Sequence, residues 1–433
     1  MMKTTFVLGI VVSILILFSG IIFVLMNQSN VSNENIPNEN PDDLPSLTAM
    51  ESEAYAETIN DFSFNFFREL YQNPPMESDL FYSPYSVFTA LAMTYEGSEG
   101  PTASEMADVL NILQDNESFH SYVHFLYKYL NQNDEYTIST ANALWIREDY
   151  QILNTYLDTV ETYYQATSQR VDFSKKVQAA EIINQWVENN TNNLIKDLIS
   201  PGNIDPDLCR LILTNAIYFN GTWQVQFDEA NTTDREFELS TGEKTNVSTM
   251  MLTGTEDRFN YTETEQLQLL ELPYAGNEIS MIIGLPKEGI NLSKVINNLN
   301  ETAYNSWFDS MDKKEVDIYL PKFKIETPVI NLNQYLQALG IREAFSSSAD
   351  FSGITGNKDL RISDVLHKAY IDVNEVGTEA AAATAVIMVT SVNGGTSSRI
   401  TFDCNHPFLF MLQHKETGTI LFMGTVEHPS YES

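Results

Sequence analysis

Basic residues are scarce in this sequence. Among its 433 residues, 24 are lysine or arginine and 59 are aspartate or glutamate, which gives a formal net charge of −35. A protein of this charge has little with which to neutralise a phosphate backbone, so nucleic-acid binding is excluded as a default role. Activation by a heparin-like polyanion is disfavoured for the same reason.

Cysteine is almost absent. Cys209 and Cys404 are the only two, and each lies beside or within an apolar run that is typical of a strand. An extracellular location would permit a disulfide between them. Because the two runs are far apart in the sequence, we predict two buried free thiols instead.

The motifs of common catalytic and cofactor sites are also missing. There is no Gly-x-Ser-x-Gly elbow, no glycine-rich phosphate loop and no His-Glu-x-x-His helix. His120 and His124 lie one helical turn apart, but no third ligand is evident, so two histidines on a helix surface are the favoured interpretation. The sequence therefore predicts a protein that is not an enzyme and that holds neither a metal nor a cofactor.

Only the N-terminus has a long apolar run. Residues 6–26 carry no charge and are long enough to span a bilayer as a helix. Lys3 precedes this run and the next basic residue is Arg68, a bias that places the rest of the chain outside the membrane. The prediction is a transmembrane signal-anchor at residues 1–26, with a cleaved signal peptide as the alternative.

The remainder of the chain divides at about residue 48. Residues 27–48 are rich in Asn, Pro, Glu, Asp and Ser and predict a disordered linker, followed by a single domain at 49–433. The expected location of this domain is extracellular or on the cell surface. Asn-x-Ser/Thr sequons such as that at Asn116 agree with export and glycosylation.

Two runs in the domain predict strands with one polar residue on the buried face. Residues 211–219 place Asn215 on an apolar face, and residues 365–373 alternate cleanly with His367 on the inner face and Leu366 on the outer one. Each polar side chain must be hydrogen-bonded inside the protein, and each could satisfy the other if the two strands were neighbours.

The segment from residue 375 to residue 388 has an ambiguous pattern. Its alanine run favours a helix, whereas Gly377 and the β-branched residues that follow favour a strand or a loop. At a spacing of two residues, one face is small and uncharged and then apolar, and Glu379 falls on the other face. The inner face consists of Thr378, Ala380, Ala382, Thr384, Val386 and Met388. A strand, a loop and a helix all stay open on this pattern.

Several separated motifs resemble those of the serpin family of serine protease inhibitors, in the same order. The resemblance covers the chain from about residue 50 to Pro429. Its motifs are Phe-Tyr-Ser-Pro-Tyr-Ser-Val at 81–87, Asn-Ala-Ile-Tyr-Phe-Asn-Gly-Thr-Trp at 215–223, Leu-Pro-Lys-Phe at 320–323, His-Lys-Ala at 367–369, Asn-His-Pro-Phe at 405–408 and Phe-Met-Gly-Thr-Val at 422–426.

The resemblance implies an α+β fold with three β-sheets, about eight or nine helices and an exposed reactive-centre loop. In the family, a serine protease cuts this loop and becomes linked to it, and the loop then inserts into the largest sheet. The hinge and inserting residues would be Glu375, Gly377, Thr378, Glu379, Ala380, Ala381, Ala382, Ala383 and Thr384. The polar cluster that controls opening of the sheet would be Ser83, Ser86, Asn215 and His367, and the loop would first insert at Trp223 and Glu375.

Counting loop residues as the family does places the reactive bond at Ser391–Val392, with Thr390–Ser391 still open. A small uncharged residue before the bond favours elastase-like or subtilisin-like proteases as covalent partners of a monomeric inhibitor. The alternative is a non-inhibitory serpin that acts as a carrier, storage or chaperone-like binding protein. Charged or bulky inward-facing hinge residues would indicate that alternative, and the sequence has none there.

Overall fold

The computed structural model describes residues 49–431, apart from residues 77–78, 113–115, 132–134, 208 and 379–398. Within helices and strands, the side chains of residues 49–51, 116–117, 141 and 215 are also not described. The predicted anchor at 1–26 and the predicted linker at 27–48 therefore lie outside the described residues.

The predicted α+β fold with three β-sheets is confirmed. The described residues form ten α-helices, against about eight or nine expected, and the additional one, α10, has four residues. The helices are α1 (Ala49–Gln72), α2 (Pro84–Tyr95), α3 (Gly100–Leu110), α4 (Asn116–Asn131), α5 (Asn154–Tyr164), α6 (Lys176–Asn190), α7 (Leu292–Asn298), α8 (Glu301–Asp309), α9 (Asn333–Leu339) and α10 (Ser352–Thr355).

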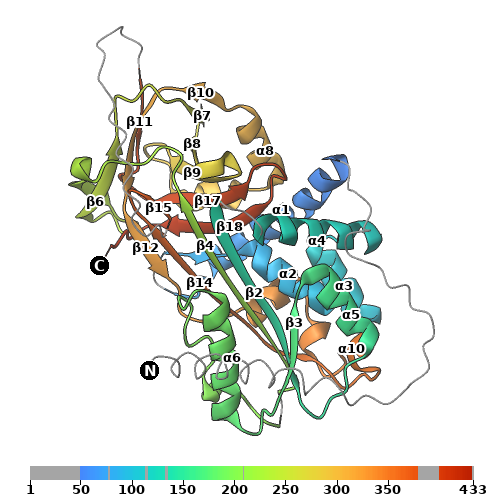
Figure 1. Ribbon diagram of the computed structural model, residues 1–433. Coiled ribbons are helices and arrows are strands. Elements are labelled where there is room, and N and C mark those ends of the chain that lie inside the picture. The colour runs from blue at the N-terminus through green and yellow to red at the C-terminus, as the bar shows by residue number, and fades with distance from the viewer. Residues whose placement is uncertain are drawn as a thin grey trace, which may run out of the picture. The chain divides into compact units, whose positions relative to one another are not determined.

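The sheet that concerns function, here called the central sheet, has the strand order β12-β14-β15-β4-β2-β3, and β13 also pairs with β14. Its long strands β2, β4 and β14 run side by side in Figure 1. The strands are β2 (Tyr136–Arg147), β3 (Thr167–Val171), β4 (Leu211–Thr222), β12 (Phe323–Glu326), β13 (Ile330–Asn331), β14 (Ile362–Val373) and β15 (Gly377–Thr378).

Two further sheets complete the fold. One has the order β1-β18-β17-β9-β8-β7-β10 and the other β16-β11-β6-β5. Their strands are β1 (Phe81–Tyr82), β5 (Thr233–Glu238), β6 (Lys244–Leu252), β7 (Phe259–Glu263), β8 (Leu267–Pro273), β9 (Ile279–Pro286), β10 (Asp312–Lys314), β11 (Val316–Pro321), β16 (Ile400–Asp403), β17 (Phe408–His414) and β18 (Ile420–Val426).

Helix α2 lies directly behind the centre of the central sheet. It begins at Pro84, which occupies its first position, and the Ser83 hydroxyl caps it by accepting a hydrogen bond from the Ser86 N–H. Eleven of its residues are buried, since it packs on β2, β4 and β18 at once. The N-terminus of α2 is thereby fixed beneath the strands that carry the polar residues described below.

Helix α6 covers the opposite face of the central sheet. Its apolar side chains pack with Trp145 of β2, Ile212 of β4 and Leu366 of β14. Leu366 is consequently buried, although the alternation of its strand predicts an outward position. The sheet is covered on both faces at this level, and a period-two pattern cannot reveal the second cover.

Both cysteines are buried and free, as predicted. The predicted location of the domain, extracellular or on the cell surface behind an N-terminal membrane anchor, is contradicted. In the described part of the chain, no helix combines the length and the apolar character that crossing a membrane requires.

Candidate functional site

The ambiguous segment begins in the structure as a strand. After β14 the chain turns at residues 374–376 and returns as β15, which lies between β14 and β4. Gly377 faces Thr222 and Thr378 faces Gly221 of β4, antiparallel, and Thr378 also faces Val373 of β14. Gly377 and Thr378, two of the predicted hinge and inserting residues, therefore already occupy the central sheet.

Thr378 points into the core. Its side chain is 1% exposed and its hydroxyl lies 2.5 Å from the hydroxyl of Tyr274. Tyr274 stacks on Trp223 with ring centroids 4.4 Å apart. A small polar side chain fits this position because it fills little space and its one polar group finds a partner.

Gly377 is required by close approach of two backbones. A Cβ at this position would lie 2.1 Å from the Gly221 carbonyl oxygen and 2.7 Å from the Thr222 Cα. Backbone atoms cannot move aside as a flexible side chain can, so no other residue fits in this register. The glycine marks the place where the returning chain enters the sheet.

Below β15 the gap is closed. Strands β4 and β14 pair directly there, in parallel, from Leu211 and Ile362 to Ile217 and Ala369. A third strand could lie between them only if these backbone hydrogen bonds were broken. At one end of the central sheet β15 therefore lies between β4 and β14 for two residues, and from Ile217 and Ala369 onward the two strands close directly on each other.

A row of polar residues crosses the closed part of the sheet. His367 of β14, Asn215 of β4 and Asn142 of β2 are in register on three neighbouring strands. The Nε2 of His367 accepts a hydrogen bond of 3.3 Å from the Ser83 N–H at the start of α2, and the Ser86 hydroxyl lies 3.4 Å from Asn142 Oδ1.

Asn142 is the member of this row that the sequence did not reveal. It is 5% exposed. Its strand also contains Thr137, Ser139 and Thr140, so the sequence offered no signal that set Asn142 apart. The Asn215 side chain lies outside the described atoms, but its backbone is in register with both His367 and Asn142. The Ser83 hydroxyl extends the network by donating to the Leu421 carbonyl of β18, at 2.6 Å.

Trp223 and Glu375 meet at the open end of the sheet. The Trp223 indole N–H donates to the Asn374 carbonyl at 2.9 Å, and its backbone N–H donates to the Val376 carbonyl at 2.8 Å. The Glu375 carboxylate lies 2.9 Å from Lys322 Nζ and accepts a 2.8 Å hydrogen bond from the Thr232 hydroxyl. Burial raises the pKa of Glu375, but these two partners outweigh it and hold the pKa below its ordinary value.

The two helical histidines have separate partners. His120 Nε2 lies 2.9 Å from the Glu96 carboxylate and its ring stacks on Tyr163, whereas His124 Nδ1 lies 3.1 Å from the Thr162 carbonyl. Among the described residues, no group of three or more His, Cys, Asp or Glu side chains is arranged to hold a metal ion. The other predicted site residues, Glu379 to Thr384 and the bond at Ser391–Val392, lie outside the described residues.

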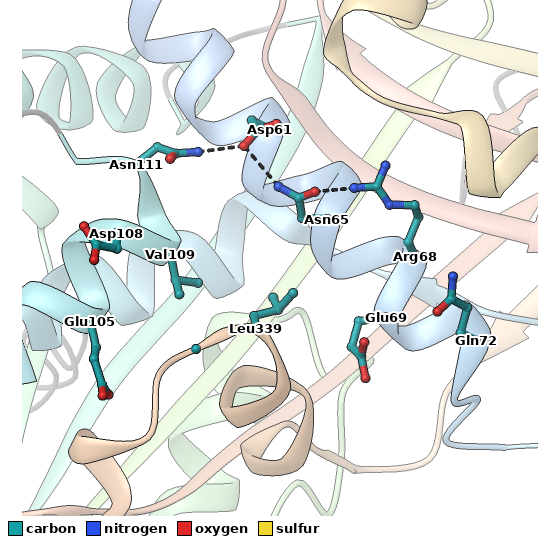
Figure 2. A pocket seen from close by; sticks show the side chains of 11 residues that line it. Asp61, Asn65, Arg68, Glu69, Gln72, Glu105, Asp108, Val109, Asn111 and Leu339 are labelled. Atoms are coloured by element: carbon teal, nitrogen blue, oxygen red, sulfur yellow. Dashed lines mark hydrogen bonds between the residues drawn. The ribbon is translucent and has the colours of Figure 1, made fainter.

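A cavity of about 550 Å³ lies between α1, α3 and α9 (Figure 2). It is acidic, with Asp61, Glu69, Glu105 and Asp108 against Arg68. One of these carboxylates already has partners within the protein, because Asp61 accepts hydrogen bonds from the side-chain amides of Asn65 and Asn111. The cavity contains none of the hinge residues, and we assign it no function.

His414 at the end of β17 is fully buried. Its Nδ1 lies 2.9 Å from the Thr417 hydroxyl and the ring of Tyr129 packs against it. Burial lowers the pKa of His414 to about 4, partly offset by the nearby Glu416 carboxylate. The folded protein therefore keeps this histidine neutral at a pH where the unfolded chain protonates it.

Acidification should consequently destabilise the fold through His414. Between the unfolded-state pKa near 6.5 and the folded-state pKa near 4, only the unfolded chain takes up the proton, which costs about 3 kcal/mol once the pH is below both values. We expect the fall in melting temperature between about pH 7 and about pH 4.5 to be smaller in His414→Gln than in the unsubstituted protein. An equal fall in both proteins would show that His414 does not titrate in this way.

Comparison with known proteins bears on the family of the chain and on its fold. The family model described as Serpin (serine protease inhibitor) matches residues 57–429. An uncharacterized serpin-like protein of Methanosarcina acetivorans is 41% identical over 363 residues, which cover 82% of each chain.

Solved structures resemble the fold over most of the chain. The crystal structure of Serpin48, a highly specific serpin of the insect Tenebrio molitor, matches with a TM-score of 0.79 at 34% identity, covering 88% of this chain and all of that one. Human thyroxine-binding globulin in complex with its ligand matches with a TM-score of 0.77 at 27% identity, covering 88% of this chain and all of that one.

Proposed function

This chain belongs to the serpin family, and on that premise we propose that it inhibits a serine protease by offering a loop as substrate and then inserting the cut loop into the central sheet. The family is described as serine protease inhibitors and its members are not enzymes, in agreement with the prediction that the chain is not an enzyme. The observation that carries the proposal is β15, a hinge strand of small residues already lodged between β4 and β14.

The chemistry of trapping is supplied by the protease. Its active-site serine attacks the carbonyl carbon of Ser391, the peptide bond to Val392 breaks, and the new amino terminus leaves with a proton from the protease. The loop and the protease are then joined by an ester. Water can hydrolyse this ester and release both proteins. Inhibition therefore requires that loop insertion be faster than hydrolysis of the ester.

Register determines where the inserted residues would go. If the chain continues in the register in which Thr378 faces both Gly221 and Val373, Thr384 arrives between Asn215 and His367. Insertion of the loop would therefore part the polar row at its centre and place a hydroxyl there. We propose Ser83, Ser86, Asn215 and His367, together with Asn142, as the group that holds the strands together until this point.

The free energy released by loop insertion is large enough to oppose a bound protease. Roughly ten further residues would join the ladder at about 1 kcal/mol each, which gives on the order of 10 kcal/mol before any apolar burial. The uninserted protein is a stored state of higher free energy, and serpin loop insertion is itself one of the recognised examples of such a switch. We propose Trp223 and Glu375 as the place where insertion begins, because Trp223 donates to the Asn374 carbonyl in the turn that precedes β15 and Glu375 lies in that turn.

The small uncharged residue at the proposed bond favours elastase-like or subtilisin-like targets, since trypsin-like proteases require Lys or Arg there. A carrier function, as in thyroxine-binding globulin, is the alternative within the same fold. The inward hinge position argues against it, because Thr378 is small, buried and uncharged.

Incubation of the protein with elastase or subtilisin is expected to give a covalent band on a denaturing gel, at the summed mass of the two proteins. Trypsin is the matched control, and we expect no such band with it, because no Lys or Arg occurs between residues 375 and 398. Cleavage of the loop without a covalent band, with every serine protease tested, would rule out the inhibitory mechanism.

A further inference from the structure

Ser430 and Tyr431 lie against the edge of the central sheet. They follow the end of β18 by four and five positions. The Lys324 N–H of the edge strand β12 donates to the Ser430 carbonyl at 3.0 Å. This bond places the next residue, Tyr431, beside the turn that leads into β15. The described C-terminal segment thus reaches the open end of the sheet from outside.

The ring of Tyr431 holds Lys322 in place. The Lys322 ammonium lies 4.3 Å from the centre of this ring and 2.9 Å from the Glu375 carboxylate. The side chains of Lys322 and Glu375 are 16% and 9% exposed, so the cation lies between an aromatic face and a carboxylate with little water. Cation–π attraction is strongest where water is excluded in this way.

The hydroxyl of Tyr431 lies near the turn itself. Burial and the nearby Asp372 carboxylate raise the pKa of Tyr431, and the Asn374 side chain partly offsets them. The Asn374 side-chain oxygen in turn accepts from the backbone N–H groups of Val376 and Gly377, at 3.0 and 3.3 Å. One side chain from the C-terminal segment therefore supports the network that shapes residues 374–377.

Asn374 and Glu375, which lie near Tyr431 and its neighbour Lys322, make contacts across the gap between β14 and β4. Glu375 reaches across to the Thr232 hydroxyl, and the Asn374 carbonyl accepts from the Trp223 indole, which follows β4. These contacts join the β14 side of the gap to the β4 side. They must break or rearrange before β14 can move away from β4 to admit a strand.

We propose that Tyr431 is a positioning residue for loop insertion, which keeps the turn at 374–376 closed across the gap and so limits the rate at which the central sheet opens. The inference rests on the proposed function, because it concerns the step that follows cleavage of the loop. According to this proposal, a residue outside the inserting loop, in the C-terminal segment, affects the rate of insertion.

A synthetic peptide with the sequence of residues 378–391 tests this inference. The peptide should enter the gap as a strand, and its uptake can be followed by the rise in melting temperature. We expect uptake to be several-fold faster in Tyr431→Ala. The variant Tyr431→Phe keeps the ring over Lys322 and removes the hydroxyl near Asp372 and Asn374, so its rate shows whether the ring or the hydroxyl restrains opening.

The matched control is Tyr150→Ala. Tyr150 has a similar contact with a cation, the Arg147 guanidinium at 5.1 Å, and its hydroxyl donates to the Asp359 carbonyl and not to the turn. We expect this variant to take up the peptide at the unsubstituted rate. The loop-cleaved form of Tyr431→Ala should melt within a few degrees of the unsubstituted cleaved form, because the restraint acts before insertion.

The possible failures are distinguishable. If the unsubstituted protein neither takes up the peptide nor gains stability on cleavage, the proposed function fails. If it does both, and Tyr431→Ala takes up the peptide at the unsubstituted rate, only the role of Tyr431 is wrong. An equal loss of stability in the uncleaved and cleaved forms of Tyr431→Ala would likewise reduce this residue to a general structural contact.

Discussion

Replacing Thr378 with arginine is expected to turn the protein from an inhibitor into a substrate. Thr378 is buried against Tyr274, with 1% of its side chain exposed. An arginine at this position would leave the sheet in the uncut protein, and insertion of the cut loop would then have to bury its unpaired charge, at a cost of several kcal/mol. A barrier raised by about 3 kcal/mol slows insertion more than a hundredfold, and hydrolysis of the ester then precedes it.

The stoichiometry of inhibition measures this effect. We expect it to rise at least tenfold in Thr378→Arg, with the loop cut as quickly as before and the protease released active. Glu379→Arg is the matched control, because the alternation of a strand places residue 379 on the opposite side from Thr378. Full inhibition by Thr378→Arg would show that the inward face has been wrongly assigned.

Cleavage of the loop near Ser391 should raise the melting temperature sharply. Insertion adds a strand to the central sheet and contributes on the order of 10 kcal/mol to the stability of the cleaved form. For a domain of this length, the entropy of unfolding converts this into a rise on the order of 10 °C or more. Most proteins lose stability when a chain is cut, so a rise of this size is specific to insertion.

Calorimetry before and after cleavage, with a protease that cuts the loop without being trapped, provides the measurement. Cleaved Thr378→Arg is the control, and we expect it to show a smaller gain because its hinge resists insertion. An unchanged melting temperature in the unsubstituted protein would contradict the proposal that the loop enters the sheet.

These two experiments examine different steps of one process. The first changes the competition between insertion and hydrolysis, and the second measures the free energy that insertion releases. A protein could insert its loop too slowly to trap a protease and still gain stability when cut. Together the measurements separate an inhibitor from a serpin that has kept the switch and lost the speed.

The sequence by itself determined the features that are local. The start of α2 follows from a capping serine and a proline that are neighbours in the chain, Ser83 and Pro84. The buried position of His367 follows from the alternation of its own strand. The small inward face of the hinge can be read from residues two apart. Such patterns are visible because a helix or a strand repeats its geometry over a few residues.

The tertiary structure decided which distant residues meet. Tyr274 under Thr378, Asn142 in the polar row and Tyr431 over Lys322 each join segments that lie far apart in the sequence. No local periodicity encodes such a pairing, because it depends on the order of strands in a sheet. The burial of Leu366 beneath α6 was hidden for the same reason.

In the segment from residue 375 onward, the local sequence and the tertiary structure each decide part of the conformation. Its sequence permits a helix, a loop and a strand, and local propensity alone does not choose among them. The choice at Gly377 and Thr378 is made by the gap between β4 and β14, where two backbones approach so closely that only glycine fits. Sequence determined that the segment could be a strand, and the neighbouring strands, by supplying unpaired backbone groups on both sides, determined that it is one.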